Sequence, residues 1–589
     1  MAYEMSFGNL RVASGGAAKP SGKFRIAVLG DFSAAANAGR VQTGAELAVR
    51  KPQRVDVDNL DDVLKRFKVA MHLPIAADDG SVELKIGEMD DFHPDQLHDE
   101  LELFSEFSGL RQRLKNRATF AAAAKEVQGW AGDETDASYT APRRSGGATL
   151  PVGKLTDFAR LVGAKGPAER EATAADELIK QIVGPHVVAA KDPQQDKLVA
   201  AVDAALSDAM RRVLHHPDFQ TVESLWRSVD LLVRNLETGS QLEIVLFDLT
   251  AEELAADLSG TDALEETGLY KLLVEQPSLD AQQGAFSVIV GGYTFEKTPP
   301  QAELLGRVAK IAYAVRAPFI AAISNDVLTK RKPEDVHPLI KESWDALRAL
   351  PEAAYLGLVT PRFLLRHPYG KKSEPIEPFD FEEFTKQEGF RGMLWGNGAF
   401  VAALLLGLTF QKQGLKSMKL GSVMSVGDIP YYYYTDDEGD QVALPCTDRL
   451  VNEATVALAT SQGFQPIVSL KGRDEVRLGS FNSLAGKPLL GPWSTEQITP
   501  SAASSTGTAS APAAVEPVAA AATPAPAPTP EPAPAAEPAA PAASLDSELD
   551  ALLASLGGSD APAGDGAAAA SSDSSGGIDP ELAALLADL

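Results

Sequence analysis

The stretch that decides the fold is Leu242–Asp248, read Leu-Glu-Ile-Val-Leu-Phe-Asp, a nearly continuous apolar run. Short runs of this kind, rich in Ile, Val and Phe, are typical of strands buried on both faces of a sheet. Similar runs follow at Phe286–Gly291 (FSVIVG) and Phe319–Ile323 (FIAAI), and helical periodicity alternates with them at Asp196–Leu214 and Ala302–Val315. The pattern predicts an α/β fold, of mixed α+β type, with largely buried sheets and flanking helices.

An earlier part of the chain repeats this mixture of strands and helices. Lys23–Gly30 (KFRIAVLG) indicates a strand that ends at glycine, and Ser81–Ile86 alternates like a half-buried strand. Asp56–Leu64 opens a helix with Asp and Asn at its start. Asp90–Leu114 is predicted to be a longer helical region in which Leu97, Leu101, Phe104 and Phe107 share one buried face.

Changes in composition divide the chain. Residues 131–153 lack periodicity and carry Gly, Pro, Ser and Thr, which indicates a linker or long loop. Beyond Trp493 the chain is rich in Ala and Pro, and such a stretch cannot bury enough apolar surface to offset its entropy. The predicted organisation is a flexible N-terminus at 1–22, a first module at 23–130, a linker at 131–175, a second module at 176–493, a disordered spacer at 494–543 and two repeated short helices at 544–589.

The charge balance disfavours two classes of partner. The formal net charge is −27, from 81 acidic and 54 basic residues, and it repels phosphate backbones and anionic lipid surfaces. The longest apolar stretch, Gly398–Phe410, has thirteen residues, which is too short to cross a bilayer and indicates a buried helix. Met1–Leu10 has no basic cluster followed by an apolar run. We therefore expect a cytoplasmic protein that neither binds nucleic acid nor inserts directly into a membrane.

The motifs of known cofactor and catalytic sites are missing. The closest approach to a phosphate-binding loop, Gly153-Lys154, is followed by Leu155 and has Ala148 where the first glycine belongs. No dinucleotide fingerprint, nucleophile elbow or zinc-protease motif occurs. The single cysteine, Cys446, excludes an intramolecular disulfide and any Cys-rich metal site. We predict no catalytic residue, no cofactor and no metal.

Three other features have structural explanations that need no chemistry. His215-His216 is a close histidine pair, but neighbouring residues point to different sides of a helix, so shared metal binding is disfavoured. Acidic pairs such as Asp61-Asp62 and Asp90-Asp91 are expected in so acidic a chain and suit helix starts. The run Tyr431–Tyr434 has no basic cluster beside it, so we expect a strand whose tyrosines alternate between its two faces rather than a base-stacking platform.

The second module resembles the large subunit of the type VI secretion contractile sheath (TssC/VipB). The resemblance begins at His215–Arg227 (HHPDFQTVESLWR) and continues in the same order along the chain. Its later parts are Leu242–Leu249, Phe286–Phe295 (FSVIVGGYTF), Ala317–Ala321 (APFIA), Tyr355–Arg366 (YLGLVTPRFLLR), Pro368–Gly370 and Leu394–Ala399 (LWGNGA). The similarity covers roughly residues 176–464, and it thins out after Leu470, where the family's large subunit continues with a helical extension.

The first module is similar to the small sheath subunit (TssB/VipA). Val28–Ser33 (VLGDFS) resembles the end of that family's first strand, and Asp90–Pro94 (DDFHP) resembles its turn motif. Leu110–Leu114 (LRQRL) follows in the family's order. The family makes these subunits as two chains, whereas here residues 131–153 join them.

The resemblance implies a mechanical function without bond chemistry. In such sheaths a subunit adds strands to a neighbour's sheet, and conversion between an extended and a contracted packing drives an inner tube outward. The expected protein is a structural subunit that self-associates, with an inner tube, a baseplate or a disassembly ATPase as further partners. One alternative is a sheath-derived adaptor that docks to a baseplate or sheath end without polymerising. Another is an enzyme, which would need a cleft with convergent titratable groups of perturbed pKa.

Two similar motifs close the chain, at Leu545–Leu556 and, 33 positions later, at Ile578–Leu589. In each, an aspartate precedes leucines spaced i, i+3, i+4 and i+7, which form one apolar stripe on a helix. The stripe residues are Leu549, Leu552, Leu553, Leu556, Leu582, Leu585, Leu586 and Leu589. We predict short helices that fold against a partner's groove, with a disassembly ATPase or a baseplate component as candidates. The alternative is that they fold onto the chain's own body.

Overall fold

The computed structural model describes residues 5–10, 22–75, 81–129, 148–149, 195–279, 284–329, 336–436, 438–496 and 498–501. Gly153-Lys154 and both leucine-bearing motifs of the tail lie outside the described residues.

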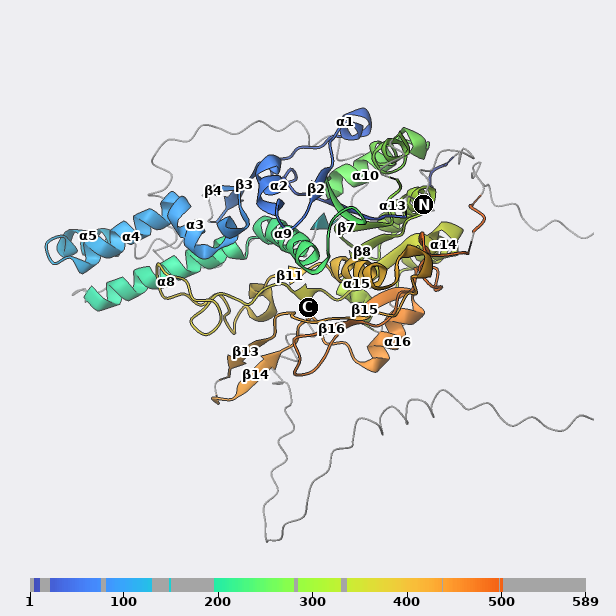
Figure 1. Ribbon diagram of the computed structural model, residues 1–589. Helices are drawn as coiled ribbons and strands as arrows, with labels where there is room; N and C mark the ends of the chain where they lie inside the picture. The colour runs from blue at the N-terminus through green and yellow to red at the C-terminus, as the bar shows by residue number, and fades with distance from the viewer. Residues whose placement is uncertain are drawn as a thin grey trace, which may run out of the picture. The chain divides into compact units, whose positions relative to one another are not determined.

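A mixed sheet of ten strands forms the centre of the described body (Figure 1). Its strands are β1 (Phe24–Gly30), β2 (Gln53–Val55), β5 (Ala148–Thr149), β6 (Leu242–Asp248), β7 (Val288–Phe295), β8 (Phe319–Ile323), β9 (Leu356–Thr360), β12 (Ser425–Val426), β15 (Phe464–Ser469) and β16 (Val476–Leu478). The order is β12-β16-β15-β9-β8-β7-β1-β6-β2, and β5 pairs with β7. The inner strands are parallel, whereas β2, β16 and β12 join the two ends in antiparallel fashion. The predicted α/β class with a buried sheet is confirmed.

Helices and smaller strand pairs surround this sheet. The helices are α1 (Gly44–Ala48), α2 (Leu60–Phe67), α3 (Pro94–Glu100), α4 (Glu102–Lys115), α5 (Phe120–Gly129), α8 (Gln195–Leu214), α9 (Pro217–Asn235), α10 (Ala251–Ser259), α11 (Gly268–Tyr270), α12 (Gln276–Leu279), α13 (Pro299–Val315), α14 (Pro338–Ala349), α15 (Gly398–Gln413) and α16 (Glu453–Ser461). The smaller antiparallel pairs are β3 (Val69–Pro74) with β4 (Ser81–Ile86), β10 (Phe363–Leu364) with β11 (Trp395–Gly396), and β13 (Tyr432–Thr435) with β14 (Gln441–Leu444).

The two faces of the sheet belong to two different cores. Phe24, Ile26 and Val28 of β1 join the core that contains α9 and α15, while Ala27 and Leu29 join the core of α10 and α13. Because side chains alternate across a strand, a strand covered by helices on both faces buries side chains in both directions and is mostly apolar. All seven residues of β1 are buried. The predicted burial of the apolar stretch 398–410 is confirmed, since it forms most of α15.

Histidine followed by proline starts three of the described helices, and each histidine accepts a backbone hydrogen bond. Nδ1 of His93 accepts from Asp95 N at 3.2 Å, and Nδ1 of His216 accepts from Asp218 N at 3.2 Å. His337 does the same for α14 with Leu339 N at 3.3 Å. Proline suits the first helical position because its missing N–H would have no helical partner there.

The helical region predicted over 90–114 is divided in the structure. A 3₁₀ turn (Met89–Phe92) precedes α3, and α4 begins after Leu101, whose backbone is extended. Pro94 explains the first break, because proline pushes the preceding residue out of the helical region. The predicted apolar face is nevertheless buried at all four positions. The strand predicted at 286–291 is also shifted, since β7 begins at Val288 and ends at Phe295.

Helices from both modules form a common arm that extends from the sheet. In Figure 1, α4 and α5 of the first module lie alongside α8 of the second. Arg111 pairs with Asp203 at 2.6 Å across α4 and α8. Gln195 Nε2, at the start of α8, donates to the Leu114 carbonyl oxygen at 2.7 Å and so satisfies an end of α4. The modules are therefore joined both in the sheet and in the arm.

This arrangement predicts that the two modules stay together when the chain is cut between them. A protease site placed within residues 131–147 and cleaved should give two fragments that co-elute in gel filtration, because β1 remains paired on both edges. Ile26→Asp should break this association, since it places a carboxylate among buried apolar side chains at a penalty of several kcal/mol. Val57→Asp, at a half-exposed position of the same module, is the control and should leave the fragments together. Two stable fragments that separate in the wild-type protein would contradict the prediction.

Candidate functional site: the junction of the two modules

The junction centres on β1, which comes from the first module and lies between two strands of the second. Seven residues of β1, Phe24 to Gly30, are in parallel register with Leu242 to Asp248 of β6. On its other side, Ile26 to Leu29 pair with Val288 to Gly291 of β7. Without β1, β6 and β7 would each present a row of unpaired N–H and C=O groups. The first module therefore completes the sheet of the second.

A buried ion pair fixes the register at the start of β1. Arg25 is 4% exposed and lies directly opposite Glu243 of β6, with its Nε 3.1 Å from Glu243 Oε2. Its Nη1 donates to the Gly284 carbonyl oxygen at 2.6 Å, and the guanidinium stacks 4.4 Å from the Phe286 ring centroid. A shift of β1 by one residue would move Arg25 to the opposite face and leave Glu243 without this partner.

The other end of β1 carries a network of carboxylates that joins both modules. Asp31 accepts from the amides of Ala35 at 2.6 Å and Ala36 at 3.0 Å, which shapes the loop after the strand. Asp248, at the end of β6, accepts from the amide and hydroxyl of Ser33 at 3.1 and 2.6 Å. Burial, together with the nearby Asp248 carboxylate, raises the pKa of Asp31 to about 7. These hydrogen bonds hold the loop of one module onto a strand of the other.

Arg50 adds a second connection at this end. It donates to the Asp248 carbonyl oxygen and to both carboxylate oxygens of Glu253, which is buried in α10. The hydroxyl of Tyr293, on β7, donates to the Leu249 carbonyl oxygen at 2.7 Å. Polar groups at both ends of β1 are therefore engaged in joining the modules.

A second buried network lies within the second module and is built around Arg366. Its Nε donates to Glu223 of α9 at 2.8 Å, and its Nη1 and Nη2 donate to Glu383 at 2.7 and 3.0 Å. The guanidinium also stacks 4.2 Å from the centroid of Tyr369. Although burial opposes the charged form, Arg366 and His215 hold the pKa of Glu383 down to about 2. The network fixes the long excursion between β10 and β11 onto α9.

His215 and His216, the neighbouring histidines for which the sequence disfavours a shared metal, both have structural roles. His216 caps α9, as described above. His215 pairs with Glu383 at 3.6 Å and with Glu388 at 3.2 Å. Burial lowers the pKa of His215, but these two carboxylates outweigh burial and raise it to about 9. The two rings therefore serve different partners, as expected for neighbours in sequence.

The tyrosine run alternates as predicted. The rings of Tyr432 and Tyr434 pack at a tilt against Phe384, with centroids 5.2 and 5.4 Å from its ring, and those of Tyr431 and Tyr433 pack at a tilt against each other at 5.1 Å. Cys446 is buried, and burial raises the pKa of its thiol, which makes it a weaker nucleophile. Asp91 accepts from the amides of Gly87 and Glu88 at 2.6 and 2.8 Å, so this member of an acidic pair stabilises a helix start.

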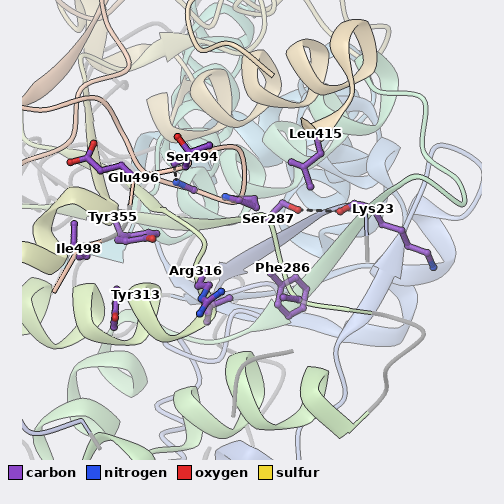
Figure 2. Close-up of a pocket in the computed structure, with 15 residues that line it drawn as sticks. Lys23, Phe286, Ser287, Tyr313, Arg316, Tyr355, Leu415, Ser494, Glu496 and Ile498 are labelled. Carbon is purple, nitrogen blue, oxygen red and sulfur yellow. Dashed lines mark hydrogen bonds between the residues drawn. The ribbon is translucent and has the colours of Figure 1, made fainter. Parts of the chain in front are cut away.

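A pocket of about 380 Å³ opens at the amino ends of the central strands (Figure 2). Its walls include Lys23, Phe286, Arg316, Tyr355 and Glu496. It lies at the opposite end of β1 from Asp31 and Asp248. Burial raises the pKa of both carboxyl groups, and neither faces the pocket. Burial raises the pKa of Tyr355, which makes that hydroxyl a weaker acid. The pocket and the perturbed carboxylates do not converge on one site.

Within the described ranges, no group of three or more His, Cys, Asp or Glu side chains is placed to hold a metal ion. No described helix is both long enough and apolar enough to cross a membrane.

Sequence reasoning missed the buried charged residues of the junction and of the Arg366 network. Arg25 and Glu243 did carry a signal, because each is a charge inside an otherwise apolar strand. Arg366, Glu223 and Glu383 carried none, since they lie far apart in sequence and look like ordinary charged residues. The eight leucines of the tail that are predicted to bind a partner lie outside the described residues, so their role remains a prediction.

The buried network predicts a large difference between two arginine substitutions. Arg366→Met should lower the free energy of unfolding by about 3–5 kcal/mol, because it leaves Glu223 and Glu383 buried without their main partner. Arg234→Met is the matched control, since Arg234 is largely exposed and pairs with Asp230 one helical turn away. That change should cost about 0.5 kcal/mol or less. Denaturant unfolding of both variants tests this, and equal losses would show that the Arg366 network does not stabilise the fold.

Comparisons with known proteins agree with this two-part organisation. Residues 196–485 match the family model VipB, described as "EvpB/VC_A0108, tail sheath N-terminal domain". Residues 10–128 match the family model described as "Type VI secretion system, VipA, VC_A0107 or Hcp2". The two matched ranges contain β1 on one side and β6 and β7 on the other.

A curated relative supports the larger match. The type VI secretion system sheath protein TssC1 of Pseudomonas aeruginosa is 33% identical over 296 residues, which cover 47% of this chain and 59% of that protein. The chain thus spans less than two thirds of the length of this relative. The chain belongs to the type VI secretion sheath family, with a small-subunit (TssB/VipA) segment and a large-subunit (TssC/VipB) segment joined in one polypeptide.

Proposed function

We propose that this protein is a structural subunit of a contractile sheath-like assembly, in a type VI secretion system or a related contractile injection apparatus. It works by association and repacking of copies and not by catalysis. The observation that carries the proposal is β1, which the small-subunit segment inserts between β6 and β7 of the large-subunit segment. This makes the fused chain one rigid building block, so that a change of packing takes place between copies.

An exposed sheet edge supports self-association. β2 ends the sheet and, among the described strands, pairs only with β6. Val49 and Val57, on either side of β2, are 76% and 55% exposed. β2 itself is short and carries Arg54, with Lys51 and Pro52 before it, so the two valines are the apolar part of this edge that favours contact with another chain. A second copy is the occupant we propose for this edge.

The absence of a catalytic role is part of the proposal. It is supported by the sheath families that the chain matches and by the separation of the pocket from the perturbed carboxylates. We further propose that the protein acts in the cytoplasm, with an inner tube and a baseplate as its structural partners.

The edge predicts which substitutions disturb assembly. Purified protein should form tubes or rings in negative-stain electron microscopy, and Val49→Lys with Val57→Lys should reduce them at least tenfold, because two lysines oppose pairing at the edge. Leu450→Lys, at an exposed apolar position elsewhere, is the control and should assemble normally. Circular dichroism should be unchanged in all three proteins.

The same experiment distinguishes a sheath subunit that polymerises from an adaptor that does not. Well-folded wild-type protein that stays monomeric under all assembly conditions would contradict the sheath proposal and favour a non-polymerising adaptor. Assemblies that survive both lysine substitutions would leave the sheath function in place but exclude the β2 edge as the contact.

We also propose that the two tail motifs are docking helices for a partner, with a disassembly ATPase or a baseplate component as the candidates. Twelve residues are too few for a stable isolated helix, so each motif should fold only against a groove. A buried leucine contributes roughly 1.5–3 kcal/mol, which is partly offset by the ordering of the helix. Two copies in one chain raise the overall affinity by avidity.

The spacing of the motifs gives a matched pair of variants. Leu552, Leu553, Leu585 and Leu586 changed to Asp should abolish co-precipitation of the partner from cells that make the full chain. Ala551, Ala554, Ala584 and Ala587 changed to Asp add the same charge on the opposite side of each helix, at 100° per residue, and should retain the partner. Equal recovery with both variants would contradict docking through the leucine stripe.

A further inference from the structure

The N-terminal segment Met5–Leu10 lies against α13 and the turn that follows α10. The sequence predicts a flexible segment over 1–22, but these six residues contact the large-subunit segment. All but the last of them precede residue 10, where the match to the small-subunit family begins. The contact therefore lies almost entirely outside the region shared with that family.

Two backbone hydrogen bonds pair the segment with the turn that follows α10. The amide of Asn9 donates to the Asp262 carbonyl oxygen at 2.6 Å, and the amide of Leu264 donates to the Asn9 carbonyl oxygen at 3.0 Å. Asn9 thus forms a parallel bridge with Ala263. Main-chain pairing of this kind is a common way for proteins to bind extended peptides.

Two buried cationic side chains of α13 bind backbone carbonyl oxygens of the segment. Lys310 is 4% exposed, and its Nζ donates to the Gly8 carbonyl oxygen at 2.6 Å. Arg307 is 6% exposed, and its Nε donates to the Ser6 carbonyl oxygen at 3.0 Å. Arg307 also donates to the carbonyl oxygens of Leu258 and Thr261 at 2.8 and 2.9 Å, so it shapes the opposite wall. Both cations would lose a carbonyl acceptor if the segment left.

The surface selects the residue type at two positions of the segment, Phe7 and Gly8. The ring of Phe7 lies over Gly306 so closely that a Cβ at residue 306 would be 2.1 Å from Phe7 Cδ1. Gly8 has a φ of +65°, and a Cβ there would be 3.0 Å from Leu264 Cδ2. Glycine is therefore required both in the segment and in the helix that receives it. An aromatic residue followed by glycine is the pattern that fits.

We propose that this surface, formed by Asp262, Leu264, Gly306, Arg307 and Lys310 and here called the α13 groove, is a peptide-recognition site. Its ligand is an extended segment with an aromatic residue followed by glycine, and the chain's own residues 5–10 are the ligand that occupies it. The contact is short, and the ordering of six residues opposes it, so the segment opens locally and exchanges. The groove then accepts the same peptide supplied in trans.

The first test uses the full chain and frees the α13 groove by weakening the segment that occupies it. Phe7→Ala weakens the chain's own segment but leaves every groove residue in place. A fluorescent peptide of residues 1–12 should bind this variant at least tenfold more tightly than the wild-type chain, whose own segment competes at a high effective concentration. The same peptide with alanine in place of Phe7 should bind at least tenfold more weakly. Adding Gly306→Ala to the Phe7→Ala chain should abolish peptide binding, while adding Gly109→Ala should not.

Gly109 is a matched control because it also lies inside a helix, α4, and a Cβ there would meet nothing within 4 Å. Gly306→Ala alone should raise hydrogen exchange at the amides of residues 6–10 at least tenfold, with Gly109→Ala unchanged. Unaltered exchange in Gly306→Ala would overturn the proposal. So would peptide binding that is equal with and without Gly306→Ala, or no peptide binding to the Phe7→Ala chain.

Discussion

Everything in this structure depends on the pairing of β1 with two strands that arise more than 200 residues later in the chain. A central strand cannot be withdrawn without exposing two rows of backbone hydrogen-bonding groups and the apolar side chains on both of its faces. The small-subunit segment is therefore part of the folding unit of the large-subunit segment. In this chain the two are also covalently joined, which keeps them at a high effective concentration during folding.

The charged residues at the junction specify how the two segments meet. Apolar strands in a buried sheet tolerate several registers, because Val, Ile and Leu pack in similar ways. Arg25 opposite Glu243, and Ser33 on Asp248, are satisfied in one register only. Buried ion pairs add little net stability, but breaking one is expensive. The same reasoning applies to Arg366, which holds a long excursion of the chain in a single position on α9.

This use of buried charge fits the proposed function as a structural subunit of a sheath. A building block that is repacked against its neighbours must not deform internally, and closely packed cores with satisfied polar networks are rigid. Two sites on the surface differ from this rigid interior because they can pair with another chain. The β2 edge and the α13 groove both offer backbone or apolar groups that another extended chain can satisfy. The molecule thus combines a fixed interior with surfaces suited to strand addition.

The sequence by itself determined the elements whose signal is local. The apolar runs of β1, β6 and β8, the buried helix α15 and the alternating tyrosines of β13 follow from side-chain periodicity and were predicted correctly. Residues that carry the family resemblance were equally local. Tertiary structure alone decided which strands are neighbours, because the same apolar pattern fits any central position of the sheet. It also decided that Arg366 meets Glu223 and Glu383, and that Phe7 lies on Gly306, since such partners are distant in sequence and only the folded chain brings them together.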